Sequence, residues 1–208
     1  MSQGFTPSTQ QADQIRSGPS NADRRLVLLH GWGADANDLF ELGAMLTDPP
    51  VSVVALQAPL THPTGQGRQW YDLQQPQWPQ LPEAREDLRR RLLELHQELP
   101  LERTVLLGFS QGAAMALDVA TDGLIPAGVV SCSGYPHPNW KPTADQRPPV
   151  LLTHGREDPV VPFAASEELQ RQLVKGGRPV QLLGFSGGHS IDEALLPELR
   201  RFLIACWS

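Results

Sequence analysis

The stretch TVLLGFSQGAAMAL, residues 104–117, decides how the rest of the chain is interpreted. It starts as an apolar run, passes through Gly108-Phe109-Ser110-Gln111-Gly112, and continues with small and apolar residues. Glycines on both sides of a serine let a strand turn abruptly into a helix, which leaves the serine on a strained, exposed turn. We therefore predict a strand–turn–helix unit with Ser110 at its apex. The G-x-S-x-G pattern by itself is weak, so an ordinary serine in a small-residue bend is the alternative.

Apolar runs and helical segments alternate along nearly the whole chain. The predicted strands are short, rich in Val and Leu, and bounded by Gly or Pro: 24–30, 51–59, 104–110, 127–134, 149–155 and 179–185. They do not alternate apolar with polar residues, which is typical of strands buried on both faces of a parallel sheet. Helical periodicity predicts helices over 38–46, 83–99, 112–121, 164–175 and 197–207. This order predicts an α/β protein with a doubly wound, mostly parallel sheet and helices on both faces.

The length of 208 residues suits one domain with a sizeable core. Residues 1–24 are polar and broken by Pro and Gly, so we expect an N-terminal tail or an edge strand there. Residues 25–208 then form the domain, without a large cap. The Pro- and Gln-rich loop from Thr61 to Pro82 is the one long irregular insertion, and loops of this length are often functional.

Composition excludes several classes of function. The net charge is −6 and no basic run exceeds Arg89–Arg91, which argues against nucleic acid as the main partner. No segment approaches the roughly 18 apolar residues of a membrane span, and the first residues lack a signal peptide, so we expect a cytoplasmic protein. Cys132 and Cys206 show neither CxxC spacing nor a metal-ligand pattern, and free buried thiols are expected. The pattern allows a homodimer without requiring one.

A serine hydroxyl needs a base, and the base needs an orienting acid. Where the nucleophile lies in a G-x-S-x-G turn, the acid and then the histidine follow it in the chain. His189, in FSGGHS, follows the last predicted strand on a glycine-rich loop and is the predicted base. Asp158, in HGREDPVVP, follows the fifth predicted strand and is the predicted acid, whereas Glu157 should point elsewhere. Structural or surface roles are expected for the other histidines: His30, His62, His96, His137 and His154.

The oxyanion of a tetrahedral intermediate also needs backbone donors. One should be the N–H of Gln111, directly after the nucleophile. The second should come from the turn His30-Gly31-Trp32-Gly33, which follows the first strong strand, with Trp32 as the donor. A plain glycine-rich loop is the alternative for this turn.

The segments LLHGWGAD, GFSQGAAMAL, SGYP, LLTHGREDPVVP and GGHSI occur in this order from about Arg25 onward. With RQWYDL at 68–73, they resemble the phospholipase/carboxylesterase family of α/β-hydrolases, the relatives of acyl-protein thioesterase. The resemblance implies the α/β-hydrolase fold and hydrolysis of carboxylic esters, in some members of thioesters or lysophospholipids, without a metal or other cofactor. It also implies the triad Ser110, Asp158 and His189. Trp32 stands where many relatives carry leucine, a bulkier group beside the acyl site.

The sequence thus predicts a serine carboxylesterase that acts through an acyl-enzyme on short- to medium-chain esters. Trp70 and Tyr71 are candidates to shape an apolar acyl pocket, with core packing equally open to them. Two alternatives stay open: an acyl-protein thioesterase or lysophospholipase with the same triad, and a binding module with a dead site. The complete triad argues against the dead site. The expected partner is a small-molecule ester or acyl substrate.

Overall fold

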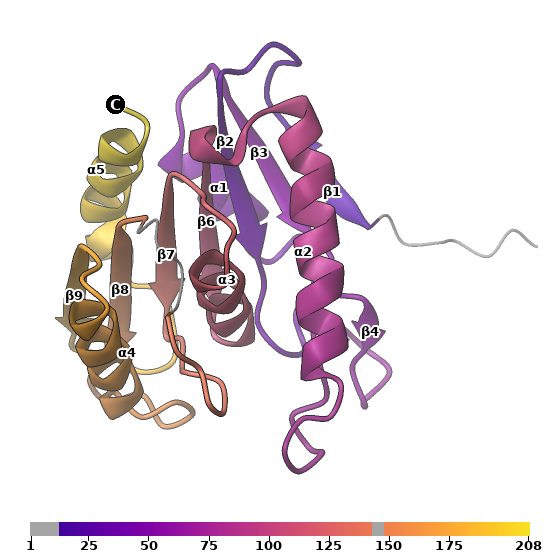
Figure 1. The fold of residues 1–208 in the computed structure, drawn as a ribbon, viewed down its shortest axis with the longest axis vertical. Coiled ribbons are helices and arrows are strands. Elements are labelled where there is room, and N and C mark those ends of the chain that lie inside the picture. Colours follow the sequence, from indigo (N-terminus) through magenta and orange to yellow (C-terminus); the bar gives the residue numbers. More distant parts are fainter. Residues whose placement is uncertain (1–12, 143–147) are drawn as a thin grey trace, which may run out of the picture.

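In the computed structural model, which describes residues 13–142 and 148–208, a seven-stranded sheet runs through the centre (Figure 1). One edge strand, β1 (Gln14–Ser17), pairs antiparallel with its neighbour β3. The other strands are parallel: β2 (Arg24–Leu29), β3 (Val51–Leu56), β6 (Thr104–Phe109), β7 (Gly128–Cys132), β8 (Val150–Gly155) and β9 (Val180–Phe185). This mostly parallel sheet confirms the predicted fold class. The division of the chain at residue 24 stays a prediction.

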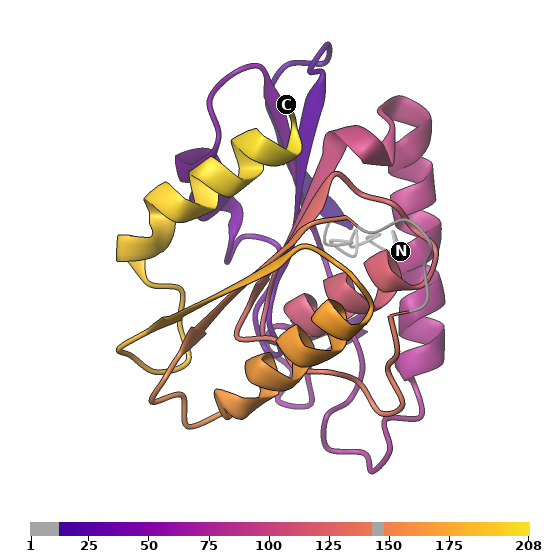
Figure 2. The same cartoon turned by 60° about the vertical axis from the view of Figure 1, so that its left-hand side comes forward.

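Helices cover both faces of the sheet, as Figure 2 shows with the sheet nearly edge-on. α1 (Phe40–Leu46) and α5 (Leu196–Cys206) share one apolar core, whereas α2 (Leu81–Glu98), α3 (Gln111–Thr121) and α4 (Ala164–Lys175) share the other. Alternate residues of β2 serve the two cores: Leu26 and Leu28 belong to the first, Val27 and Leu29 to the second. Because both faces of the strand are covered, both sets of positions must be apolar, which is why the sequence does not alternate.

The longest helix, α2, shows why these segments become helices. Its buried residues recur every three or four positions, which places them in one stripe facing the sheet: Leu81, Ala84, Leu88, Leu92 and Leu95. A proline lies in its first turn, where no intrahelical N–H bond is lost. The helix therefore begins two residues before the predicted start at residue 83.

The segment predicted as one long irregular loop contains a small hairpin. Its strands, β4 (Leu60–Thr61) and β5 (Arg68–Gln69), pair antiparallel over two residues each. A ladder this short shows no alternation of apolar and polar residues, so periodicity did not detect it. The prediction of an irregular segment was wrong for this part.

Within the described residues, no helix has both the length and the apolar character needed to cross a membrane. Cys132 is buried and Cys206 half-buried, and both are free thiols. Burial raises the pKa of Cys132 to about 11.

The order of the strands is β1-β3-β2-β6-β7-β8-β9, so the chain leaves β2 first toward β3 and later continues on the opposite side, at β6. In open parallel sheets, ligands bind outside the carboxyl ends of the strands at such a switch point. Here that point lies between the ends of β2 and β6, which are followed by the His30–Gly33 turn and by Ser110. The fold therefore brings together two of the predicted site segments.

Candidate active site

Ser110 occupies a sharp turn between β6 and α3. Its backbone dihedrals are φ 52° and ψ −116°, a left-handed conformation that non-glycine residues rarely adopt. The flanking glycines are required by close packing, because a Cβ on Gly108 would lie 2.4 Å from the carbonyl oxygen of Gly112. A Cβ on Gly112 would lie 2.1 Å from the carbonyl oxygen of Leu29. The G-x-S-x-G spacing is thus a consequence of helix α3 starting directly against two strands.

Backbone hydrogen bonds hold Ser110 in this conformation. Its N–H donates to the carbonyl of Cys132 over 2.8 Å, and its own carbonyl accepts from Ala113 and Ala114 in the first turn of α3. Ser110 is 8% exposed. The serine therefore lies at the positive end of a helix, where developing negative charge is stabilised.

His189 and Asp158, separated by 31 residues in the chain, form a direct contact. His189 Nδ1 lies 2.7 Å from Asp158 Oδ2, and the carboxylate side chain has no exposed surface. A carboxylate accepts only, so Nδ1 carries the proton and Nε2 remains free to act as a base. The second oxygen, Asp158 Oδ1, accepts the backbone N–H groups of Val160 and Val161 at 2.8 and 2.9 Å.

These contacts set the charge state of Asp158. Burial alone works to raise the pKa of the carboxyl, but the hydrogen bond from His189 and the two backbone N–H groups outweigh it. The pKa of Asp158 consequently lies below its ordinary value of 3.8. The carboxylate is therefore ionised at neutral pH and can stabilise a protonated His189.

A second histidine supports the same carboxylate. His154 Nε2 lies 2.8 Å from the carbonyl oxygen of Val161 and 3.2 Å from Asp158 Oδ2, so Nε2 must carry a proton. Nδ1 is then the acceptor for the hydroxyl of Ser166, 2.6 Å away. Of the structural and surface roles expected for the other histidines, His154 has the structural one: its ring is buried and hydrogen-bonded, and it also contacts the predicted acid.

The loop that carries His189 is tied to the end of β8. Gly187 accepts the N–H of Glu157 at 3.0 Å, and its own N–H donates to the Glu157 carboxylate. A Cβ on Gly155 would lie 2.2 Å from the carbonyl oxygen of Gly188, so β8 and the loop are in close contact. The Glu157 carboxylate therefore binds Ser186 and Gly187 of this loop, whereas Asp158 contacts the imidazole.

His189 lies beside the nucleophile turn. Its ring centroid is 4.8 Å from that of Phe109, the residue before Ser110. Among the described residues no hydrogen bond joins Ser110 to His189. Such bonds are often long in the free form of an enzyme and shorten when substrate binds.

The turn after β2 approaches the serine from the other side. A Cβ on Gly31 would lie 3.5 Å from Ser110 Cβ. Three backbone N–H groups follow Gly31. That of Gly33 donates to the carbonyl of Arg68 and that of Ala34 to the carbonyl of Gly31, whereas the N–H of Trp32 has no acceptor among the residues that the structure describes. The N–H of Gln111 is the first of α3 and has no intrahelical partner. Within the part of the chain that the structure describes, the backbone N–H groups of both predicted oxyanion donors thus have no hydrogen-bond acceptor.

The β4–β5 hairpin holds this turn in place, a role that sequence reasoning missed. The carbonyl of Arg68 accepts from Gly33 at 2.8 Å, and the N–H of Arg68 donates to Ala34 at 2.7 Å. Gln69 accepts the indole N–H of Trp32 at 2.7 Å. The segment RQW at 68–70, which follows Gly65 and Gly67, could have indicated a tight turn at this place. Nothing in the local sequence indicated which loop this turn would contact.

The side chain of Gln111 bridges the segment that follows the hairpin. Its amide oxygen accepts from the N–H of Trp70 at 3.0 Å, and its amide nitrogen donates to the carbonyl of Tyr71 at 2.8 Å. Trp70 and Tyr71 are themselves fully buried in the α2–α3–α4 core. Of the two roles left open for them, this burial favours packing behind the site over direct contact with substrate.

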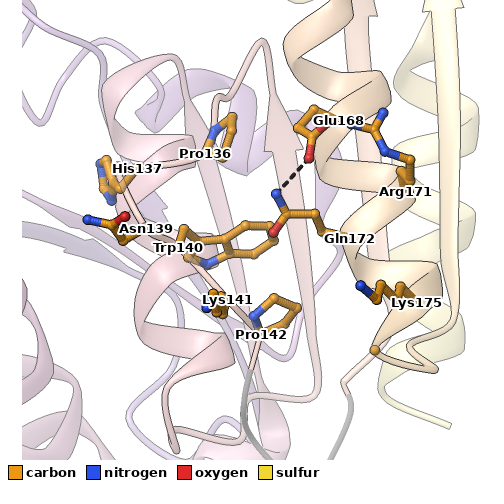
Figure 3. Close-up of a pocket in the computed structure, with 11 residues that line it drawn as sticks. Pro136, His137, Asn139, Trp140, Lys141, Pro142, Glu168, Arg171, Gln172 and Lys175 are labelled. Carbon is orange, nitrogen blue, oxygen red and sulfur yellow. Dashed lines mark hydrogen bonds and ion pairs between the residues drawn. The ribbon is translucent and has the colours of Figure 1, made fainter.

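A cavity of about 790 Å³ lies outside the predicted triad and the turn that carries Trp32. Figure 3 shows Pro136 to Pro142 on one side of it and residues of α4, including Glu168 and Gln172, on the other. Its size exceeds that of the groove beside His189, which has about 420 Å³, but none of the predicted triad lines it. We therefore place the candidate chemistry at the switch point and not in this cavity.

Comparisons with known proteins cover most of the chain. A model of the Phospholipase/Carboxylesterase family matches residues 10–207. Esterase YpfH of Escherichia coli (strain K12) is 27% identical over 199 residues, which cover 86% of this chain and 81% of that protein. Acyl-protein thioesterase 1 of Candida albicans is 28% identical over 229 residues, which cover 92% and 96%.

Solved structures show the same architecture. The crystal structure of esterase PE8 superposes with a TM-score of 0.86 at 30% identity and covers 93% of this chain and 98% of that one. The Bacillus cereus carboxylesterase has a TM-score of 0.83, covering 95% and 96%, and at 20% identity it supports the fold alone.

Proposed function

Because the chain belongs to the phospholipase/carboxylesterase family and is an esterase-type hydrolase, we propose that it cleaves carboxylic esters with Ser110 as nucleophile, His189 as base and Asp158 as orienting acid. The observation that carries this proposal is the 2.7 Å contact of His189 Nδ1 with the buried carboxylate of Asp158. It leaves Nε2 of the imidazole free to act as a base, and the ring packs against Phe109, the residue before the serine on its strained turn. This is the arrangement that activates a hydroxyl near neutral pH.

In the first half-reaction, Ser110 Oγ attacks the ester carbonyl carbon while its proton moves to His189 Nε2. The carbonyl oxygen becomes an oxyanion, and the N–H groups of Trp32 and Gln111 are positioned to stabilise it together with the N-terminus of α3. The C–O bond to the alcohol then breaks, and His189 gives its proton to the departing oxygen. Asp158 stays ionised throughout and stabilises the imidazolium.

In the second half-reaction, water takes the place of the alcohol. It gives a proton to His189 Nε2 and attacks the acyl carbon, and the C–O bond to Ser110 breaks as Oγ recovers that proton. The products are a carboxylic acid and the regenerated enzyme. The half-exposed indole of Trp32, fixed by Gln69 and packed against His62 at 4.1 Å, lies on the oxyanion side, where we place the acyl group. A rigid indole there favours short- to medium-chain acyl groups.

Hydrolysis of p-nitrophenyl esters from acetate to palmitate, by wild type and Ser110→Ala, tests the proposal. We expect the highest kcat/KM among the shorter chains and loss of activity in the variant. Ser110→Ala protein that keeps most of the hydrolysis would overturn the triad assignment. Retained secondary structure by circular dichroism is the control for folding.

A thioesterase or lysophospholipase is the second candidate, and the similarity to the Candida albicans acyl-protein thioesterase over most of both chains favours it. Octanoyl and palmitoyl thioesters, assayed beside oxygen esters of the same chains, separate the two. A rise in kcat/KM toward long chains or toward thioesters would favour the second candidate. Absence of serine-dependent activity on every substrate would favour a dead binding site.

A further inference from the structure

A groove of about 420 Å³ begins at His189 and runs between α1 and the segment that follows His189. On the far side of the sheet from α2, α3 and α4, it belongs to the core of α1 and α5. Apolar side chains form its walls: Leu39, Leu42, Met45, Phe109, Ile191 and Leu196. Met45 is 54% exposed, so part of the apolar wall of this groove is open to solvent.

The charged groups of this groove are all acidic. Asp38 and Glu41 come from the α1 side and Glu193 from the opposite side, and neither Lys nor Arg is among the described residues that line it. None of the three carboxylates takes part in an ion pair with another described residue. Burial, and the nearby charge of Asp35, raise the pKa of Asp38. The groove therefore combines apolar walls with uncompensated negative charge.

The chemistry of the triad says which part of a substrate would lie here. The proton held by His189 must reach the oxygen of the leaving alcohol, so that oxygen lies on the His189 side of Ser110. The carbonyl oxygen lies toward the N–H groups of Trp32 and Gln111, and neither of these residues lines the groove. A cavity that contains the imidazole but neither oxyanion donor continues from the leaving group.

We propose that this groove binds the alcohol part of the substrate and that its carboxylates select alcohols with an apolar body and a positive charge over neutral or anionic ones. The inference rests on the proposed function of His189, which defines the leaving-group side. Apolar walls supply affinity without regard to charge, whereas three like charges at the rim act on a charged substrate at close range. Specificity between alcohols of equal shape therefore comes from Asp38, Glu41 and Glu193.

Two butyrate esters of equal size test this selection. Butyrylcholine carries a quaternary ammonium where 3,3-dimethylbutyl butyrate carries a quaternary carbon, so the ratio of their kcat/KM values isolates charge. The two alcohols differ in intrinsic reactivity, but this difference cancels when the ratio is compared between wild type and a variant. We expect the ratio to fall about fivefold in the triple variant Asp38→Asn, Glu41→Gln and Glu193→Gln.

A matched control removes the same number of charges elsewhere. Glu86, Glu94 and Glu102 are exposed on α2 and on the turn after it, away from the groove, and their triple substitution by Gln should leave the ratio unchanged. The effect should be measured at about 10 mM salt and should shrink at about 0.5 M, because ions screen exposed charges. Met45→Lys, at an exposed position, should lower the ratio by itself.

A second pair of esters tells the leaving-group side from the acyl side. 4-Nitrophenyl 4-(trimethylammonio)butyrate and 4-nitrophenyl 5,5-dimethylhexanoate differ by the same charge within the acyl group. Their ratio should stay the same in the groove triple variant. A change in this ratio with none in the alcohol pair would mean that the groove holds the acyl group, and it would overturn the inference.

The failure of this inference is distinguishable from failure of the proposed function. If hydrolysis of all four esters depends on Ser110 but neither ratio changes in the groove variants, the selection by charge is wrong and the triad stands. If hydrolysis persists in Ser110→Ala, the proposed function itself is wrong.

Discussion

Asp118 and His137 form a second buried carboxylate–imidazole pair, with Asp118 Oδ2 and His137 Nδ1 2.5 Å apart and both side chains at most 5% exposed. The other imidazole nitrogen, Nε2, contacts the hydroxyl of Tyr71 at 2.9 Å, and that hydroxyl contacts Tyr135 at 2.7 Å. Burial raises the pKa of Tyr135 to about 12. These contacts link Asp118 of α3 to Tyr71, whose carbonyl accepts from the side chain of Gln111, and they do not include Ser110.

Asp118→Asn should lower the free energy of unfolding by about 2 kcal/mol, because a buried imidazole loses its charged partner. Urea denaturation followed by tryptophan fluorescence measures this. Asp122→Asn is the matched control, because Asp118 and Asp122 both pair with Arg85 but Asp122 is 62% exposed. This substitution should lower the free energy of unfolding by less than about 1 kcal/mol. Equal losses in the two variants would show that the buried pair does not stabilise the fold.

Asp158→Asn should reduce kcat by about 10³- to 10⁴-fold while leaving the protein folded, because an amide can donate to Nδ1 and stabilise the wrong tautomer of His189. Initial rates on p-nitrophenyl butyrate measure it. Glu157→Gln serves for comparison, because Glu157 anchors the histidine loop without contacting the imidazole. We expect a much smaller loss there, and a loss of similar size in both variants would argue against Asp158 as the orienting acid.

The lowered pKa of Asp158 predicts how stability depends on pH. Its folded-state pKa lies below the ordinary 3.8, so the ionised carboxylate stabilises the fold above that pH, and this contribution disappears as the pH falls through the folded-state pKa. The stability difference between wild type and Asp158→Asn should therefore be constant near neutral pH and shrink below about pH 4. Urea titrations across this range measure it.

Asp38 provides a control of opposite sign for that experiment. Its pKa is raised by burial and by Asp35, so wild type should gain stability relative to Asp38→Asn as the pH falls through the folded-state pKa of this group. The same direction of change in both variants would contradict the assigned shifts.

Gly67→Ala should lower kcat by roughly tenfold or more, because it displaces the turn that carries Trp32. A Cβ at Gly67 would lie 1.9 Å from the carbonyl oxygen of Gly33, and both glycine and alanine would need a φ of 73° there. Gly65→Ala is the control: its φ is 79°, but no atom lies within 4 Å of the added Cβ. The backbone strain is thus shared, and equal kcat values in the two variants would show that the hairpin does not position the turn that carries Trp32.

Local patterns determined a large part of this protein. Apolar runs bounded by Gly and Pro located the parallel strands, and the three- and four-residue spacing on α2 located that helix to within two residues of its start. The position of Ser110 between Gly108 and Gly112 indicated the turn. Both glycines are needed because a Cβ on either one would collide with backbone: Gly108 with that of Gly112, and Gly112 with that of Leu29 on the neighbouring strand β2. The triad itself was predicted from chain order and stays a prediction, although His189 and Asp158 do contact each other.

Tertiary structure alone decided which distant segments meet. The contact of Arg68 with Gly33, the pairing of Asp118 with His137, and the groove between α1 and the segment after His189 leave no periodic trace in the sequence. Each depends on how the twisted sheet and its two helical layers place loops that are separated by tens of residues. The hydrogen bonds between such loops form only once the layers have packed. Strands and helices, in contrast, are visible in the sequence because each apolar position is set by whether that residue is buried.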